Sequence, residues 1–275
     1  VVFVALVLAL GTGASDGFVF AVGVTVALVP EALLPTVTLA LAVGAQRMAD
    51  RNALVRRLES VETLGSTTFI CTDKTGTLTE NRMNVVAVWT PAGAVAVDGP
   101  GYGPTASIAG DAAAIDAARA LAVVARRCSN GRSVDRGGEW EPVGDPMEVA
   151  IDALAARLGA DVATDVTADP DEARFAFDPR RRRMSVLTRR RVLVKGAPDA
   201  VAPQCSHIDA GWEAAAADMS SRGLRLLGVA VRDRTSTDVD GVARDVESVE
   251  RDLTLLGVIG IVDPPRVGVR DAIAE

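Results

Sequence analysis

The sequence predicts an α/β protein that carries an inserted α+β domain and begins with a pair of membrane-spanning helices. Three observations support this prediction. An apolar, β-branched run over residues 67–72 is followed at once by a polar turn that contains glycine. Strand-like and helix-like patterns then alternate over residues 84–254, and a long apolar stretch, residues 18–45, comes first. Strands that alternate with helices favour an α/β fold, and about 20 apolar residues can cross a bilayer.

The composition excludes several classes of protein. The 275 residues carry a net charge of −7, which argues against nucleic acid as a partner because nucleic-acid binders need a basic face. The cysteines are Cys71, Cys128 and Cys205, and their spacing matches no metal or redox motif, so we expect reduced thiols. The chain begins without methionine and stops just inside a predicted helix, and we therefore expect a fragment of a longer protein.

Residues 1–46 are predicted to form the membrane hairpin, with residues 18–45 as its complete helix. A buried core helix is the alternative. A basic cluster at one end favours a membrane span over a core helix and marks the cytoplasmic side. It consists of Arg47, Arg51, Arg56 and Arg57. We therefore expect a multi-pass membrane protein, in a bacterial plasma membrane, with residues 47–275 in the cytoplasm.

Within this helix, Pro30 and Pro35 remove backbone donors and are expected to break the helix. Glu31 lies between them, and a carboxylate at mid-membrane predicts a functional site because it is costly there. Unwound backbone carbonyls would coordinate a transported cation beside it: those of Val26, Ala27 and Val29. The alternative is that Glu31 only caps the second half-helix, whose dipole favours a negative charge.

The segment Asp73-Lys74-Thr75-Gly76-Thr77-Leu78-Thr79 follows the predicted strand 67–72. In open α/β sheets the chemistry lies just past the carboxyl ends of strands, and an aspartate there can form an aspartyl-phosphate. Lys74 supplies positive charge, and Thr75 and Thr77 offer hydroxyls and amides to phosphate oxygens. An Asp-Lys pair alone would indicate an ordinary turn, but the longer string, in which every position is specified, favours phosphoryl transfer.

The segment 84–254 contains three sets of residues that suit a nucleotide. Phe177 precedes four arginines, residues 180–183, and an aromatic ring beside cations suits a stacked base with phosphates. An apolar strand, residues 192–195, ends in Lys195-Gly196, and Glu148 follows Pro146 in the first turn of a predicted helix. Taken alone, each has a structural alternative: a solvated charge run, a strand exit and a helix-dipole partner.

The string from Asp73 to Thr79 resembles the phosphorylation motif of the P-type ATPases, which are ion pumps on a haloacid-dehalogenase-like, Rossmann-like core. Further segments resemble the type II branch of calcium and sodium pumps: residues 30–35, 144–148, 175–179, 195–199 and 263–266. The resemblance implies four domains. Residues 1–46 would be the end of the third and all of the fourth membrane helix. Residues 47–83 would be the stalk and first part of the phosphorylation domain, residues 84–254 the nucleotide-binding domain, and residues 255–275 the start of the second part.

The resemblance also implies ATP and Mg²⁺ as cofactors and assigns roles to residues. Asp73 would accept the phosphoryl group, Asp73 and the Thr75 carbonyl would hold Mg²⁺, and Lys74 and Thr77 would steady the phosphoryl oxygens. Glu31 would bind the transported cation. The remaining assignments all concern nucleotide binding: Glu148, Phe177, Arg182, Lys195, Gly196, Arg225, Asp263 and Arg266. Ala32, Met147 and Asp199 depart from the usual motifs.

Such pumps also need a second aspartate motif for Mg²⁺, an actuator loop and further membrane helices, and this sequence contains none of them. We therefore expect this polypeptide to bind nucleotide but not to complete a pump cycle without the remainder of the pump and a lipid bilayer. A phosphohydrolase of the same superfamily is one alternative, although it would have a second aspartate where Thr75 stands. A nucleotide-binding module without turnover and a phosphorylated signalling receiver are the others.

Overall fold

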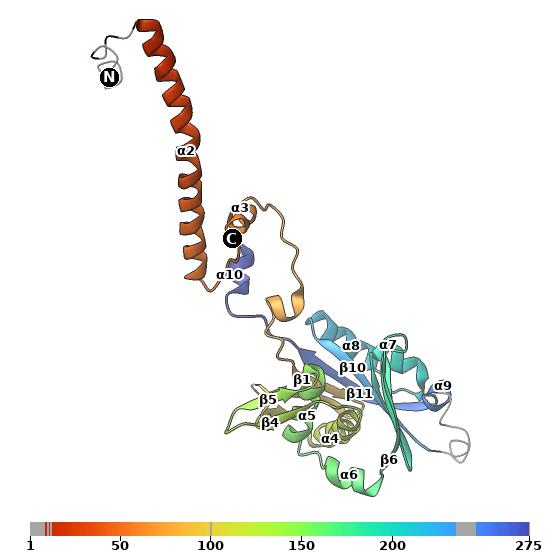
Figure 1. Cartoon of the computed structure of the whole chain (residues 1–275). Helices are drawn as coiled ribbons and strands as arrows, with labels where there is room; N and C mark the ends of the chain where they lie inside the picture. Colours follow the sequence, from red (N-terminus) through yellow and green to blue (C-terminus); the bar gives the residue numbers. More distant parts are fainter. Residues whose placement is uncertain (1–8, 10, 12, 100, 235–245, 275) are drawn as a thin grey trace. The chain divides into compact units, whose positions relative to one another are not determined.

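The computed structural model describes residues 9, 11, 13–99, 101–234 and 246–274. The chain divides into two compact units, Val1–Cys71 and Thr72–Glu275, and each is described by itself (Figure 1).

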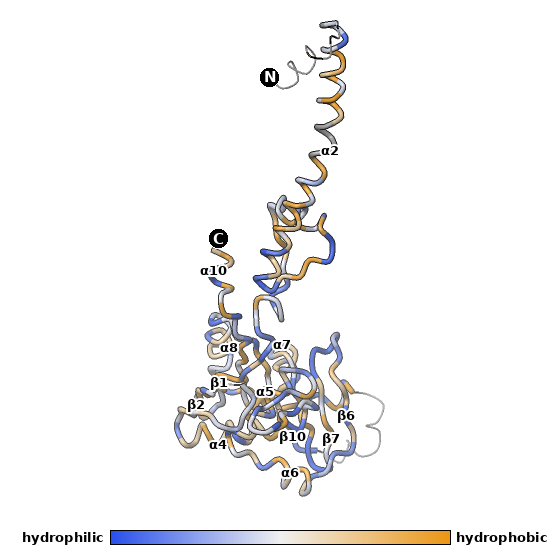
Figure 2. Tube along the Cα trace, turned by 60° about the vertical axis from the view of Figure 1, so that its left-hand side comes forward, coloured by the Kyte–Doolittle hydropathy of each residue, from blue (hydrophilic) through white to orange (hydrophobic). Residues whose placement is uncertain are grey.

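The first unit is dominated by α2 (Ala14–Ala49), which is followed by the short α3 (Glu59–Gly65). Hydrophobic residues recur along α2, as Figure 2 shows. The helix is continuous through Pro30 and Pro35, so the predicted break in it is wrong. Each proline removes one backbone hydrogen bond, but the adjoining turns remain helical. The Thr25 and Thr38 hydroxyls donate to the carbonyls of Ala21 and Leu34, one turn earlier, each at 2.8 Å.

No helix in the described part of the chain is long and apolar enough to cross a membrane, in contrast to the span predicted over residues 18–45. The side chains of residues 28–32 lie outside the described part, and these include two of the predicted cation ligands, Val29 and Glu31.

The strand predicted over residues 67–72 is also wrong. These residues form no regular structure, and the side chains of Phe69 and Ile70 are 80% and 79% exposed. A strand exists only where a neighbour takes up its backbone N–H and C=O groups, and no described strand pairs with this segment. The α/β core predicted to contain residues 67–72 is therefore absent as a sheet among the described residues.

The second unit is built on an antiparallel sheet, which confirms the mixed α and β character predicted for the inserted domain. Among the described residues the sheet has nine strands, in the order β3-β2-β1-β11-β10-β8-β7-β6, with β9 paired in parallel to β11. The strands are β1 (Asn84–Thr90), β2 (Gly93–Asp98), β3 (Ser107–Ala109), β6 (Asp171–Asp178), β7 (Arg183–Thr188), β8 (Arg191–Gly196), β9 (Cys205–His207), β10 (Arg225–Asp233) and β11 (Leu253–Val262). A separate hairpin pairs β4 (Arg132–Asp135) with β5 (Trp140–Val143).

The strand β11 lies in the middle of this sheet, between β1 and β10. The domain boundary predicted between residues 254 and 255 therefore falls inside a strand, and the sheet continues to Val262. At Gly257 a Cβ would lie 2.0 Å from the Trp89 carbonyl oxygen, so only glycine allows this close approach of β11 to β1.

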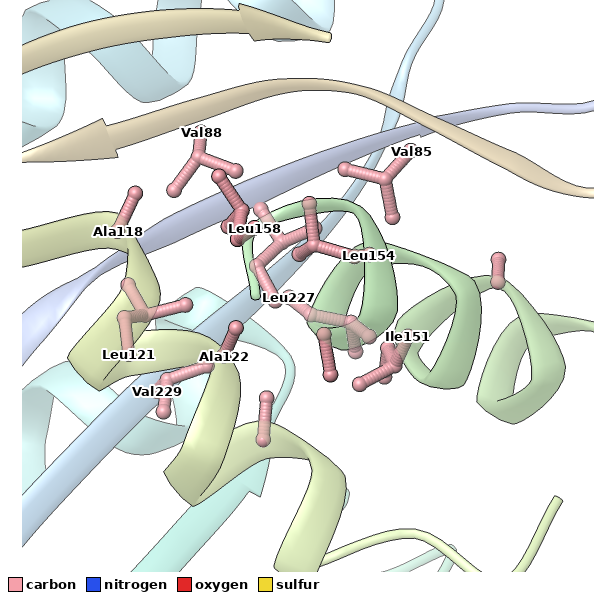
Figure 3. Packing of buried hydrophobic residues seen from close by; sticks show 14 of the residues in the cluster. Val85, Val88, Ala118, Leu121, Ala122, Ile151, Leu154, Leu158, Leu227 and Val229 are labelled. Atoms are coloured by element: carbon pink, nitrogen blue, oxygen red, sulfur yellow. The ribbon is translucent and has the colours of Figure 1, made fainter. Parts of the chain in front are cut away.

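Helices cover both faces of the sheet. On one face α4 (Ala112–Arg127) and α5 (Pro146–Arg157) pack Leu121, Ile151 and Leu154 against β-strand residues such as Val88 and Val229 (Figure 3). Neighbouring strand residues face the opposite side, where a second cluster includes Val192, Val194 and Leu255. The other helices are α6 (Val162–Ala168), α7 (Pro198–Val201), α8 (Trp212–Ser221), α9 (Val246–Val249) and α10 (Val269–Ala274).

Candidate functional site

The main candidate site is a pocket of about 550 Å³ at one end of the sheet. Its walls come from the start of α5, the β6–β7 hairpin, the end of β8 and the start of β10. Six of the residues predicted to bind nucleotide line it: Glu148, Phe177, Arg182, Lys195, Gly196 and Arg225. The structure thus brings together residues that are up to 77 positions apart in the sequence (225 − 148 = 77).

An ion pair lies at the inner wall of this pocket. The α5 helix begins at Pro146, and the side chain of Asp145 caps it by accepting from the Met147 amide at 2.9 Å, which fixes Glu148 in the first turn. One Glu148 oxygen accepts from the Asn130 and Gly131 amides at 2.8 and 3.0 Å. The other accepts from Lys195 Nζ at 3.2 Å. Glu148 therefore holds the residue 130–131 loop as well as Lys195.

The surroundings of Lys195 and Glu148 shift the pKa values of both side chains. Lys195 is buried, and Nζ also donates to Ser129 Oγ at 2.7 Å. Burial lowers the pKa of Lys195, against the opposing charge of Glu148. For Glu148, burial raises the pKa, but the Lys195 charge and the two backbone amides outweigh it, so the pKa lies below its usual value. Glu148 and Lys195 therefore form an ion pair at the wall of the pocket.

Phe177 and Arg182 lie on the hairpin that joins β6 to β7. Phe177 lines the pocket and is 57% exposed, so much of its ring is accessible to a planar ligand. Arg182 has a φ of 50°, and its guanidinium pairs with Asp199 at 2.7 Å on the surface. An exposed pair of this kind is weak, so the guanidinium can turn to an anionic ligand at little cost.

Gly196 sets how closely β8 approaches this hairpin. A Cβ at Gly196 would lie 2.5 Å from Arg183 Cβ and 2.6 Å from the Arg182 carbonyl oxygen. The Ala197 amide donates to that same carbonyl at 2.9 Å. Glycine is therefore required here because the backbone of the pocket floor touches the turn that carries Arg182.

Sequence reasoning missed the apolar part of the pocket, which includes Met184, Leu226 and Leu227. Met184 and Leu227 also belong to the hydrophobic core, and the sequence offers no signal that separates a core residue at a pocket edge from any other core residue.

The predicted phosphorylation segment forms a single π-type turn over Lys74–Leu78. Gly76 has a φ of 77°, a value that glycine adopts without strain. The exposed Asp73 carboxylate accepts from the Thr75 amide at 3.2 Å, and the Gly76 amide donates to Thr79 Oγ1 at 3.1 Å. The loop thus presents a carboxylate and a lysine to solvent, and both suit a phosphoryl group.

Asp263 and Arg266 contact this loop, and the 550 Å³ pocket does not include them. Thr79 Oγ1 donates to Asp263 Oδ2 at 2.6 Å. The Arg266 amide and guanidinium donate to the carbonyls of Leu78 and Gly76, each at 2.9 Å. The segment after β11 therefore holds the predicted phosphorylation loop in place.

A small cavity of about 80 Å³ lies beside Lys74, and Thr75, Arg225 and Asp263 are among the residues that line it. Asp263 Oδ1 is buried and has no hydrogen-bond partner among the described residues. Arg225 lines both this cavity and the larger pocket, and so connects the two predicted parts of the site.

The oxygen atoms of this loop fit Mg²⁺ that arrives with a nucleotide. The described residues contain no group of three or more acidic, histidine or cysteine side chains that could hold a metal alone. Mg²⁺ is usually bound by one or two carboxylates together with substrate phosphates and water. Asp73 and the Thr75 carbonyl supply ligands of that kind.

Comparison with known proteins identifies the family. Residues 117–268, more than half of the chain, match the family model described as P-type ATPase, cytoplasmic domain N. The chain belongs to the P-type cation-transporting ATPases and contains the domain N region, which confirms the resemblance drawn from the motifs.

Individual relatives agree with this assignment. The chain is 37% identical over 282 residues to a probable cation-transporting ATPase F of Mycobacterium tuberculosis, with 95% of this chain and 31% of the relative covered. It is 36% identical to a calcium-transporting ATPase of Bacillus subtilis (94% and 31% covered). It is 30% identical to the endoplasmic reticulum calcium ATPase srcA of Aspergillus fumigatus (93% and 32% covered). The chain thus spans about a third of the length of these pumps.

Proposed function

We propose that this chain is the central part of a pump that uses ATP to move a cation across a membrane, with Asp73 as the residue that is phosphorylated. The observation that carries the proposal is the pocket in which an exposed aromatic ring lies among the cations Arg182, Lys195 and Arg225. Aromatic stacking and phosphate neutralisation are the two interactions that a nucleotide needs.

In this proposal the ATP base stacks on Phe177, and Lys195 and Arg182 lie along the nucleotide. Arg225 lines the pocket and the cavity beside Lys74, so it suits the phosphates that lead toward Asp73. Phosphoryl transfer depends mainly on positioning and charge neutralisation. The Asp73 carboxylate attacks the γ-phosphorus, the bond to the β-γ bridging oxygen breaks, and ADP leaves.

Lys74 and Thr77 would steady the transferred oxygens, and Mg²⁺, held by Asp73 and the Thr75 carbonyl, would supply further charge neutralisation. Thr79, tied to Asp263, keeps the loop closed while Asp73 remains accessible. Hydrolysis of the resulting aspartyl-phosphate would complete the ATPase reaction in the whole pump.

The transported cation is assigned to α2, to Glu31 with the carbonyls of Val26, Ala27 and Val29. Although the helix is continuous, Pro30 has no N–H, so the carbonyl of Val26 one turn earlier loses its usual helical donor. That carbonyl can serve a cation instead, which supports Val26 more than the others.

Three measurements test the proposal. Isothermal titration of the full chain with ATP should show binding that Phe177→Ala weakens. If the wild-type chain does not bind ATP, the nucleotide site is wrong.

In the intact pump, Asp73→Asn should abolish the acid-stable, hydroxylamine-labile phosphoenzyme and the cation-dependent ATPase activity. Full ATP turnover by this variant would refute the assignment. Glu31→Gln in the intact pump should alter the cation dependence and leave ATP binding unchanged.

A further inference from the structure

A buried acid lies outside the pocket and near its hairpin. Glu250 follows α9, and its side chain is 0% exposed. The carboxylate accepts from Ser185 Oγ at 2.7 Å, from Arg183 Nε at 2.6 Å and from Arg181 Nη1. Burying a carboxylate is costly unless it is fully paired, and this pairing requires two arginines to converge on one acid.

The two arginines flank Arg182, the pocket residue with a φ of 50°. Arg181 Nη2 also donates to the Ala176 carbonyl at 3.1 Å, which closes the hairpin turn from the β6 side. A positive φ is strained for arginine and persists only where its surroundings hold it. The Arg182 amide donates to the Asp178 carbonyl at 2.6 Å, and the Ala197 amide donates to the Arg182 carbonyl at 2.9 Å. Glu250 adds to this hold, because it binds the side chain on each side of Arg182.

Glu250 acts from the opposite face of the sheet. Met184 lines the pocket. Its neighbours Arg183 and Ser185, which bind Glu250, point to the opposite face of the sheet, because side chains alternate along a strand. The backbone around Glu250 is itself anchored, because Arg232 donates to the carbonyls of Val249 and Arg251 at 3.1 and 2.9 Å. Glu250 therefore joins the start of β11 to the turn that carries Arg182.

We propose that Glu250 is a positioning residue for the nucleotide: by holding Arg181 and Arg183, it orients Arg182 into the pocket without touching the ligand. This inference rests on the proposed ATP site.

The test is Glu250→Gln in the full chain, with ATP affinity measured by isothermal titration at fixed salt and stability measured by thermal unfolding. The matched control is Asp169→Asn. Asp169 is a second buried acid at the other end of β7, where it accepts from Thr188 Oγ1, the Arg190 amide and Arg191 Nε at 2.7–2.9 Å. Both variants should lower the unfolding temperature, but only Glu250→Gln should raise the Kd for ATP, by about tenfold or 1.4 kcal/mol.

A double-mutant cycle separates positioning from general destabilisation. In an Arg182→Ala background, the effect of Glu250→Gln on the Kd should shrink to about twofold or less, because the residue that it orients is gone. Should Glu250→Gln fail to fold, Ser185→Ala replaces it. This change alters no charge and removes one donor, and it should raise the Kd about two- to threefold.

The outcomes distinguish the two proposals. If the wild-type chain does not bind ATP, the proposed function fails. If the wild-type chain binds ATP and Glu250→Gln binds it equally well, or if Asp169→Asn weakens binding as much, the function stands and the positioning role is refuted. An undiminished effect in the Arg182→Ala background refutes it as well.

Discussion

The contact between Gly196 and the β6–β7 turn allows a sharp prediction for Gly196→Ala. An added Cβ would lie 2.5 Å from Arg183 Cβ and 2.6 Å from the Arg182 carbonyl oxygen. Carbon atoms pack at about 3.5–4.0 Å, so the turn must move by about 1 Å. Overpacking of this kind costs about 1–3 kcal/mol, and each kcal/mol lowers the unfolding temperature of a domain of this size by about 2–4 °C. Because the turn carries Arg182, we also expect the Kd for ATP to rise by about tenfold or more.

Gly228→Ala provides a matched control. Gly228 pairs directly with Gly196 on the neighbouring strand β10, but the nearest atom to an added Cβ there is 3.2 Å away, at Pro198. Thermal unfolding and titration calorimetry should show a small change for Gly228→Ala and a large one for Gly196→Ala. If Gly196→Ala unfolds at the wild-type temperature and binds ATP like the wild type, the close approach does not shape the pocket.

Three further predictions concern single residues. Phe177→Ala should weaken ATP binding by about 1–3 kcal/mol in calorimetry. It should leave the unfolding temperature nearly unchanged, because the ring is largely exposed; equal binding would exclude stacking. The pKa of Glu148 is lowered on folding, so its charge stabilises the fold above the unfolded pKa and this gain is lost as the pH falls through the folded value. Glu148→Gln should therefore flatten the acid side of a stability–pH curve, and an unaltered curve would contradict the pairing with Lys195. Iodoacetamide at pH 8 should label the exposed Cys71 and spare Cys128, whose pKa burial raises to about 12, and mass spectrometry can detect either result.

Several polar and aromatic residues that line the candidate pocket were singled out from the sequence because they belong to short motifs whose chemistry is local. A lysine at the end of an apolar strand or a phenylalanine before an arginine run can be recognised without knowledge of the sheet order. Glu250 could not be recognised in this way. It follows a polar, acidic segment that predicts a surface loop, and only the fold shows that two arginines almost 70 residues earlier turn toward it (250 − 183 = 67).

Strand pairing is the part that the sequence leaves open. Residues 67–72 and 253–262 are both apolar runs, and the same pattern suits a central strand or one that lacks a neighbour. The first has no partner among the described residues and its side chains are exposed, whereas the second lies between β1 and β10. The position of Asp263 and Arg266 follows from that pairing, since both come directly after β11.

The register of one strand pair explains how the candidate pocket and the predicted phosphorylation loop meet. Arg225 pairs with Ile261 across β10 and β11, and Asp263 lies two residues further on. Arg225 therefore lies next to the residue that binds Thr79, while also lining the pocket that contains Phe177 and Lys195. A one-residue slip would turn the Arg225 side chain to the other face of the sheet. The bulge after Val229, opposite Gly257, comes further along the same pair and leaves the pairing of Arg225 with Ile261 intact. The backbone pairing of the sheet thus fixes where Arg225 lies relative to both cavities, which is the arrangement that the proposed nucleotide site requires.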